Sequence, residues 1–150
     1  MSRNYKFHNP EGIYFVSFAV VNWLDVFIRN EYKDILLDNL QFYQKSAGME
    51  IFAWCIMTSH VHLVYRCLEH RPELVLGNFK RFTSKALVKA IKEHRKESRR
   101  EMLLSQFKAS GSKASNVHHY QFWRHDNKPI ELWSNWVIDQ KINYIHQNPV

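Results

Sequence analysis

The sequence predicts an α+β protein with a ferredoxin-like antiparallel sheet, helices on one face of the sheet and an additional C-terminal helix. Segments rich in β-branched and aromatic residues alternate with longer segments that repeat apolar residues at helical spacing. Their order is β, α, β, β, α, β, α, which matches the split βαβ arrangement. The chain has 150 residues, is 45% hydrophobic and contains only four Gly and four Pro. Residues 1–150 are therefore expected to form one globular domain.

The first half of the chain is predicted to contain three strands and one helix. Residues 13–22 follow a turn signal and are rich in β-branched and aromatic residues, which favours a buried strand. Residues 30–47 repeat apolar residues at helical spacing, and Gly48 can end that helix. Residues 49–57 and 60–67 are extended runs separated by two residues. Because a parallel crossover needs a longer connection, these two runs are predicted to pair as an antiparallel hairpin.

The second half is predicted to be mainly helical. Residues 73–94 show the apolar spacing of an amphipathic helix with many lysines on its polar side. Residues 96–119 are charged and then rich in Ser, Ala and Gly, which predicts a short helix around residues 102–107 with a flexible loop, or a mobile insertion. A short fourth strand is predicted at residues 120–125, and a last helix is predicted after a Ser134 cap.

Charge and composition narrow the functional classes. The formal net charge is +7, from 21 Lys and Arg against 14 Asp and Glu, which is expected of a protein that binds a polyanion but also of a solvated basic face. The sequence has no apolar run long enough to span a membrane, and it has no signal-peptide core. A cytoplasmic protein is therefore expected. Cys55 and Cys67 form no CxxC pattern and are predicted to be buried free thiols.

Two histidines, His60 and His62, stand one residue apart in the strand predicted at residues 60–67. Side chains alternate between the two faces of a strand, so both imidazoles are expected to project from one face, where they can converge on one ion. Val61 between them points to the other face. Two half-buried histidines that hydrogen-bond to backbone would give the same pattern, so a metal site needs a further ligand from elsewhere in the chain.

The last predicted helix offers such a ligand. Its isoleucines at 138, 142 and 145 form one stripe, which is expected to face the sheet. Tyr144 and Asn148 lie one turn apart on a neighbouring face, so a phenol and an amide oxygen would supply a nucleophile and a ligand together. The alternative is a tyrosine at the edge of the core stripe and an asparagine that precedes the proline ending the helix.

These motifs resemble the single-tyrosine HUH transposase family. The resemblance is carried by MTSHVHLVYR and, about 80 residues later, by KINYIHQNPV, and it extends to GIYFVSFAVVNWLDVF, NFKRFTSKAL and YQFWRHDNKPIELW. The segment YIHQNPV in particular is similar to the REP-associated branch, which comprises domesticated relatives of insertion-sequence transposases. Ser59 stands where family members often carry Asn. Relatives usually continue beyond Val150, so a truncated chain that lacks part of the DNA-binding surface is expected.

The resemblance implies a site and a reaction. In this family, two histidines and an amide or carboxylate on the tyrosine helix hold a divalent metal, which implies His60, His62 and Asn148 as ligands and Mg²⁺ or Mn²⁺ as the ion. It also implies Tyr144 as the nucleophile of a single-stranded DNA endonuclease and strand transferase. The product would be a 5′-phosphotyrosine and a free 3′-OH at a site flanked by a hairpin.

Single-stranded or hairpin DNA is the expected partner, and the resemblance also allows a homodimer in which Tyr144 serves its own site or its partner's. The start of the basic helix and the segment after the insertion present cations and hydroxyls suited to phosphate contacts. The predicted DNA-binding residues are Lys80, Arg81, Thr83, Ser84, Lys85 and Arg124.

Two other functions are compatible with the sequence. A ferredoxin-like sheet with basic and aromatic residues can bind RNA or DNA without cutting it, in which case replacing Tyr144 by Phe changes no activity. A metallohydrolase of small substrates would use His60 and His62 with a bound water in place of a tyrosine nucleophile.

Overall fold

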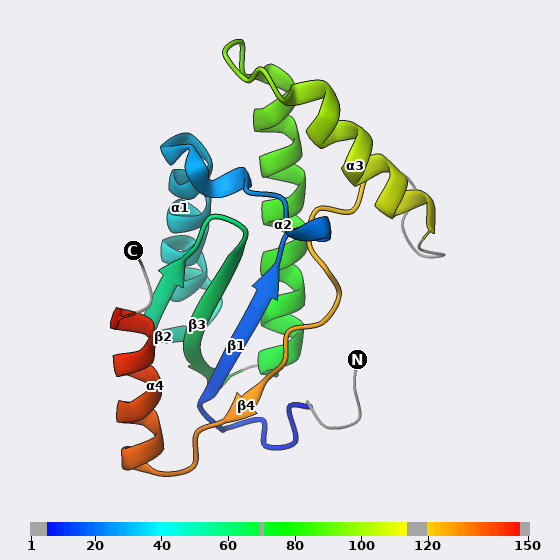
Figure 1. The fold of residues 1–150 in the computed structure, drawn as a ribbon. Helices are drawn as coiled ribbons and strands as arrows, with labels where there is room; N and C mark the ends of the chain where they lie inside the picture. Colours follow the sequence, from blue (N-terminus) through cyan, green and yellow to red (C-terminus); the bar gives the residue numbers. More distant parts are fainter. Residues whose placement is uncertain (1–5, 70, 114–119, 148–150) are drawn as a thin grey trace.

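The computed structural model describes residues 6–69, 71–113 and 120–147, and it has the predicted α+β fold. Four strands form one sheet in the order β2-β3-β1-β4, and every neighbouring pair is antiparallel (Figure 1). The strands are β1 (Tyr14–Ala19), β2 (Met49–Ile56), β3 (His60–Cys67) and β4 (Ile130–Glu131). The helices are α1 (Asn30–Ser46), α2 (Pro72–Glu93), α3 (Arg100–Lys113) and α4 (Asn135–Gln147), with short 3₁₀ turns η1 (Val21–Trp23) and η2 (Val26–Ile28).

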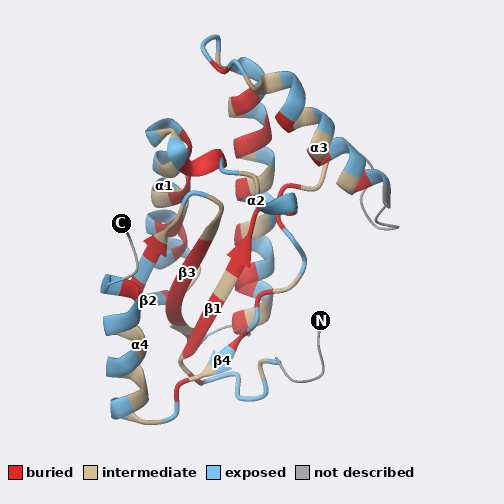
Figure 2. Cartoon of the chain, in the orientation of Figure 1, coloured by how far each residue is buried: buried red, intermediate tan, exposed pale blue. Residues whose placement is uncertain are grey.

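The strand β3 lies at the centre of the sheet, and its side chains alternate between two apolar layers. Val61, Leu63 and Tyr65 are buried in the larger core, beneath α1 and α2. Val64 points to the other face and belongs to a smaller core that α4 covers. Figure 2 shows that β1 and β3 are buried along most of their length, whereas the outer surfaces of the helices are exposed. The predicted hairpin of β2 and β3 is confirmed, with Ile56 opposite Val61.

The sheet separates α1 and α2 from α4. The C-terminal helix packs its isoleucine stripe on the sheet, with Ile145 fully buried and Ile138 and Ile142 partly buried. Its start follows the predicted cap, because the hydroxyl of Ser134 accepts a hydrogen bond from Val137 N at 3.2 Å. The helix that carries Tyr144 thus lies on the face of β3 from which the two histidines project (Figure 1).

Two elements differ from the prediction. The fourth strand is not at residues 120–125 but at Ile130–Glu131, and Trp123 makes only an isolated bridge to Val20. The backbone of this segment bonds at the end of β1 and just beyond it, where Arg124 N donates to Ala19 O and Phe122 O accepts from Val21 N, so it makes an isolated bridge and no ladder. The region of the expected short helix contains the 14-residue α3.

Among the described residues, no helix has the length and hydropathy needed to cross a membrane.

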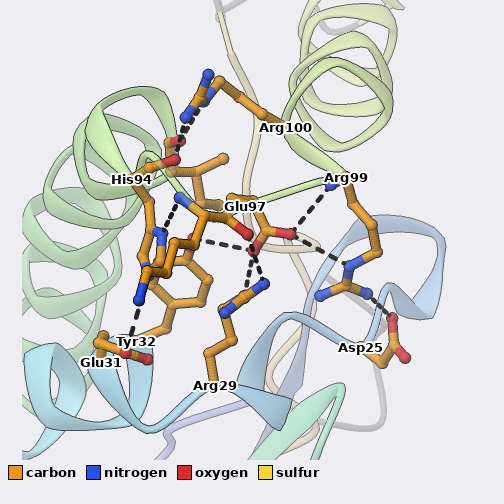
Figure 3. Close-up of polar contacts among 10 residues, drawn as sticks. Asp25, Arg29, Glu31, Tyr32, His94, Glu97, Arg99 and Arg100 are labelled. Carbon is orange, nitrogen blue, oxygen red and sulfur yellow. Dashed lines mark hydrogen bonds and ion pairs between the residues drawn. The ribbon is translucent and has the colours of Figure 1, made fainter.

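A buried carboxylate fastens the loop after α2 to the start of α1 (Figure 3). The Glu97 side chain is fully buried and accepts hydrogen bonds from Arg29 Nε at 2.9 Å, the Tyr32 hydroxyl at 3.0 Å and Arg99 N at 3.1 Å. Arg99 also pairs with Asp25 at 2.6 Å. Burial alone would raise the pKa of Glu97, but the hydrogen bonds from Arg99 and Tyr32 and the charges of Arg29 and Arg99 together lower it.

We expect replacing Glu97 by Ala to lower the free energy of unfolding at neutral pH by about 2–4 kcal/mol, because two arginines then lose a buried partner. The Glu97 pKa is lowered in the folded chain, so its contribution is present above the ordinary value of 4.5 and is lost as the pH falls below it. Urea unfolding at pH 7 and pH 3 measures both effects. The control is Glu50→Ala, which breaks an exposed pair with Arg66 and should cost about 1 kcal/mol or less. Equal costs for the two variants would contradict this role of Glu97.

Candidate active site and DNA-binding groove

The structure brings His60 and His62 together on one face of β3, with their ring centroids 4.8 Å apart. His62 is buried, with 7% of its surface exposed, and His60 is half-buried. The two-residue period of the strand accounts for this arrangement, since it places both imidazoles opposite Val61. The side chains next to them are aromatic, with Phe15 stacked on His62 and Trp23 edge-on to His60.

Each imidazole is oriented by a serine. Ser17 on β1 stands opposite His62 in the sheet register, and its Oγ lies 2.8 Å from His62 Nδ1. Ser59 Oγ lies 3.2 Å from His60 Nδ1. The tautomer that donates Nδ1–H to the hydroxyl leaves a lone pair on Nε2, which is the arrangement that metal-binding histidines need. Among the described residues, neither Nε2 has a hydrogen-bond partner.

Burial keeps both histidines neutral at physiological pH. It lowers the pKa of His60, and it lowers the pKa of His62 to about 4, to which the charges of His60 and Lys141 also contribute. A neutral imidazole is the form that binds a metal ion.

The helix α4 places Tyr144 beside the histidines. The Tyr144 ring centroid lies 5.7 Å from that of His62 and 6.0 Å from that of Phe15. Tyr144 is 48% exposed, because it sits next to the buried Ile145 at the edge of the helix face that contacts the sheet. One turn earlier on α4, Lys141 Nζ lies 5.0 Å from the Phe15 ring centroid and 5.8 Å from that of Tyr144. A phenol, two imidazoles and an ammonium group therefore share one small region.

A cavity of about 320 Å³ joins the phenol and the two imidazoles, and we call it the histidine cavity. It is lined by Ser17, Phe18, Ala19, Trp23, Met57, His60, His62, Arg124, Asp126, Lys128 and Tyr144. The described part of the chain contains no group of three or more His, Cys, Asp or Glu side chains placed to hold a metal ion. The predicted third ligand, Asn148, lies outside the described residues. Two oriented imidazoles with unengaged Nε2 atoms fit a divalent ion, and they supply two of the ligands it requires.

A second, larger cavity forms a groove of about 1070 Å³ between α2 and residues 120–127, and we call it the basic groove. It brings together five of the six predicted DNA-binding residues, namely Lys80, Arg81, Ser84, Lys85 and Arg124, and adds Lys89 and Lys92. Arg124 lines both the basic groove and the histidine cavity. The two spaces therefore adjoin.

The remaining predicted contact, Thr83, does not face the groove. Thr83 is fully buried, and its hydroxyl donates to Phe79 O at 2.8 Å and accepts from Trp123 Nε1 at 3.0 Å. A phosphate cannot reach this hydroxyl in the folded chain, and the prediction of a DNA contact at Thr83 is corrected to a packing role. Trp123 is likewise core, with 4% of its surface exposed.

Lys80 also has a role within the fold. Its ammonium group donates to Asn127 Oδ1 at 2.6 Å and to Arg124 O at 2.7 Å, so it fastens residues 124–127 to α2. Burial lowers the pKa of Lys80 to about 7, with partial compensation from the charge of Asp126. Lys80 therefore shapes the wall of the basic groove, whereas Lys85 and Lys89 are exposed along it.

Sequence reasoning did not single out Ser17, Trp23 or Lys141. Ser17 had a usable signal, because it is the one serine or threonine in the apolar run of the first strand. Lys141 had another, since it stands three residues before Tyr144 and so shares its helix face. Trp23 had no usable signal in the sequence. Its position depends on a left-handed backbone at both Asn22 and Trp23, with φ of 56° and 54°. That conformation costs a bulky residue about 1–2 kcal/mol and is not encoded in a local pattern.

The sequence is similar to one described protein family. The family model described as "Transposase IS200 like" matches residues 18–121, a span that includes both histidines and the α2 side of the basic groove and ends before Arg124 and α4. Curated proteins gave no match.

Two solved structures resemble the chain in fold. A REP-associated tyrosine transposase bound to a REP hairpin superposes with a TM-score of 0.63 at 14% identity, covering 99% of this chain and 72% of that one. A Deinococcus radiodurans protein assigned as a transposase superposes with a TM-score of 0.53 at 18% identity, covering 100% and 98% of the two chains.

We predict that His62 stays neutral until the pH approaches about 4, whereas an unfolded histidine is protonated near 6.5. The unfolded chain then binds more protons between these values, so the free energy of unfolding falls as the pH decreases from 6.5 toward 4, by on the order of 2–3 kcal/mol. Histidine NMR titration and urea unfolding at pH 7 and pH 5 test this prediction. The His62→Gln variant should lose most of this pH dependence, and a His62 midpoint near 6.5 would contradict it.

Proposed function

Because the chain belongs to the IS200-like transposase family, whose members cut and rejoin DNA, we propose that it is a metal-dependent single-stranded DNA endonuclease and strand transferase that acts at hairpin-flanked sites. The observation that carries the proposal is the histidine cavity, which gathers His60, His62 and Tyr144 from two distant parts of the chain. A nucleophile beside two oriented imidazoles suits metal-assisted phosphodiester transfer by a tyrosine.

Tyr144 is the proposed nucleophile. Its phenolic oxygen forms a bond to phosphorus while the bond from phosphorus to the 3′-oxygen breaks, which leaves a 5′-phosphotyrosine and a 3′-OH. The phenol gives up its proton, and the departing 3′-oxygen gains one. A 3′-OH that later attacks the phosphotyrosine reverses both bond changes, so the strand is rejoined without a nucleotide cofactor. Lys141 Nζ lies 5.8 Å from the Tyr144 ring centroid, so an ammonium group stands near the phosphate that this phenol would attack.

His60 and His62 are proposed to hold Mg²⁺ or Mn²⁺ through Nε2, together with the Asn148 amide. When bound, such an ion supplies Lewis-acid polarisation of the phosphate. Ser17 and Ser59 fix the imidazole tautomer and ring direction before any ion arrives. Phe15, stacked on His62, keeps water from one side of that ring.

The DNA strand is proposed to run along the basic groove and to enter the histidine cavity at Arg124. Lys85, Lys89 and Lys92 supply cations along α2, and Arg124 stands where the two spaces adjoin. Phosphate contacts of this kind position a strand without reading its sequence. The solved REP-associated tyrosine transposase is bound to a REP hairpin, which supports hairpin DNA as the class of substrate.

We predict that the protein forms a covalent complex with DNA that depends on Tyr144. The probe is a labelled pool of hairpin oligonucleotides with randomised single-stranded flanks, incubated with Mn²⁺ and resolved on a denaturing gel. The covalent band should be lost with Tyr144→Phe, with His62→Ala and with chelator. Tyr43→Phe removes a phenol from α1, outside the histidine cavity and the basic groove, and should leave the band unchanged.

The other outcomes distinguish the competing functions. Cleavage that survives Tyr144→Phe would indicate a metallohydrolase with a water nucleophile. Binding of the pool without any cleavage would indicate a nucleic-acid-binding module, and either result would overturn the proposed function. Sequencing the DNA in the covalent band identifies the cleaved bond.

We further predict that Lys85→Ala and Lys89→Ala each weaken binding of the same hairpin pool several-fold. Each lost phosphate contact on a single strand should reduce the slope of log affinity against log salt concentration by about 0.7. Fluorescence anisotropy on the Tyr144→Phe protein separates binding from cleavage. Lys45→Ala makes the same charge change on the exposed end of α1 and should leave the slope unaltered, so an equal effect at Lys45 would argue against the groove.

A further inference from the structure

Trp23 is an exposed aromatic side chain held beside the proposed metal ligands. It is 52% exposed, its ring centroid lies 5.4 Å from that of His60, and it lines the histidine cavity. The guanidinium carbon of Arg124 lies 5.8 Å from the Trp23 ring centroid on the same cavity wall. A large apolar surface thus remains in solvent at the point where the basic groove meets the histidine cavity.

The backbone that presents Trp23 is both strained and firmly anchored. Asn22 and Trp23 have left-handed φ values of 56° and 54°, a conformation that a tryptophan rarely adopts. The turn is fixed on both sides, since Asn22 Nδ2 donates to Gln106 Oε1 at 2.7 Å and Val21 N donates to Phe122 O at 2.9 Å. Arg124 is placed by the hydrogen bond from its backbone N–H to Ala19 O at 2.8 Å. Strained residues that the surrounding structure holds in place cluster at functional sites.

We propose that Trp23 is a stacking platform for the unpaired nucleobase next to the phosphate that is cleaved, with Arg124 beside it to contact the backbone of that nucleotide. This inference rests on the proposed function and adds a base-binding subsite to it. Aromatic rings bind single strands by stacking on bases, which every nucleobase permits, and an adjacent cation engages the phosphates. The position of Trp23 next to His60 allows a base on the indole to be only one nucleotide from the metal ligands.

The test compares Trp23 variants on the hairpin substrate recovered from the covalent band. Trp23→Ala should lower the cleavage rate at subsaturating DNA by about 5- to 150-fold, the range found for removing one base-stacking ring. Trp23→Phe retains a ring and should stay within a few-fold of the parent. Trp136→Ala removes a more exposed tryptophan from the first turn of α4, outside the histidine cavity, and should have no such effect.

An abasic substrate distinguishes stacking from a structural effect. Two abasic substrates are used, each of which lacks the base on one side of the cleaved bond. The parent protein should cut at least one of them more slowly than the intact substrate. On that abasic substrate, Trp23→Ala should cause no additional loss of rate. Trp23→Asn provides a second variant, because Asn tolerates left-handed backbone and should fold normally while losing the platform. Thermal unfolding monitors the fold of each variant.

Two results would overturn the inference. One is an undiminished rate for both Trp23→Ala and Trp23→Asn on the intact substrate. The other is an equal loss on intact and on both abasic substrates. In either case the parent protein still forms the covalent band, so the proposed function stands. A parent protein that forms no covalent band would instead remove the proposed function, and the base-binding subsite with it.

Discussion

The two-residue period of β3 is the constraint on which the rest of the structure depends. One set of its side chains, including Leu63 and Tyr65, completes the main core under α1 and α2. The other set carries His60 and His62 toward α4. A shift of one residue in the pairing with β1 would bury the imidazoles in the core and expose the apolar set. Stability of the core and assembly of the site therefore require the same register, in which Ser17 stands opposite His62.

The electrostatics of the site follow from that burial. The two imidazoles lie at the edge of an apolar layer and stay neutral. The cations near them come from other elements, with Lys141 on α4 and Arg124 on the segment before β4. Such a site disfavours protonation of its imidazoles. Elsewhere the buried Glu97 balances the positive charges of Arg29 and Arg99, and Asp25 pairs with Arg99 as well.

Much of the fold could be predicted from the sequence because its signals are local. The alternation in β3, the two-residue break before it and the apolar stripe of α4 each determine one element, and all three agree with the structure. The segment at residues 120–125 misled the prediction, since its aromatic residues fill the core from an irregular backbone. Thr83 misled it as well, because the helical spacing around it did not reveal that its hydroxyl pairs with Trp123. The approach of Trp23 to His60 joins distant parts of the chain through a left-handed turn, which no local pattern encodes.

The division of the apolar residues into two clusters has a consequence for the order in which the molecule opens. The cluster that holds α4 comprises Phe15, Ala53, Cys55, Val64, Leu132 and Ile145, and it is much smaller than the core on the other face of the sheet. Cooperative units that bury less apolar surface open at lower free energy than the global transition. Detachment of α4 as a separate unit would uncover the histidines while the sheet and its main core remained folded. The proposed nucleophile is therefore attached to the less stable of the two layers, and the proposed metal ligands to the more stable one.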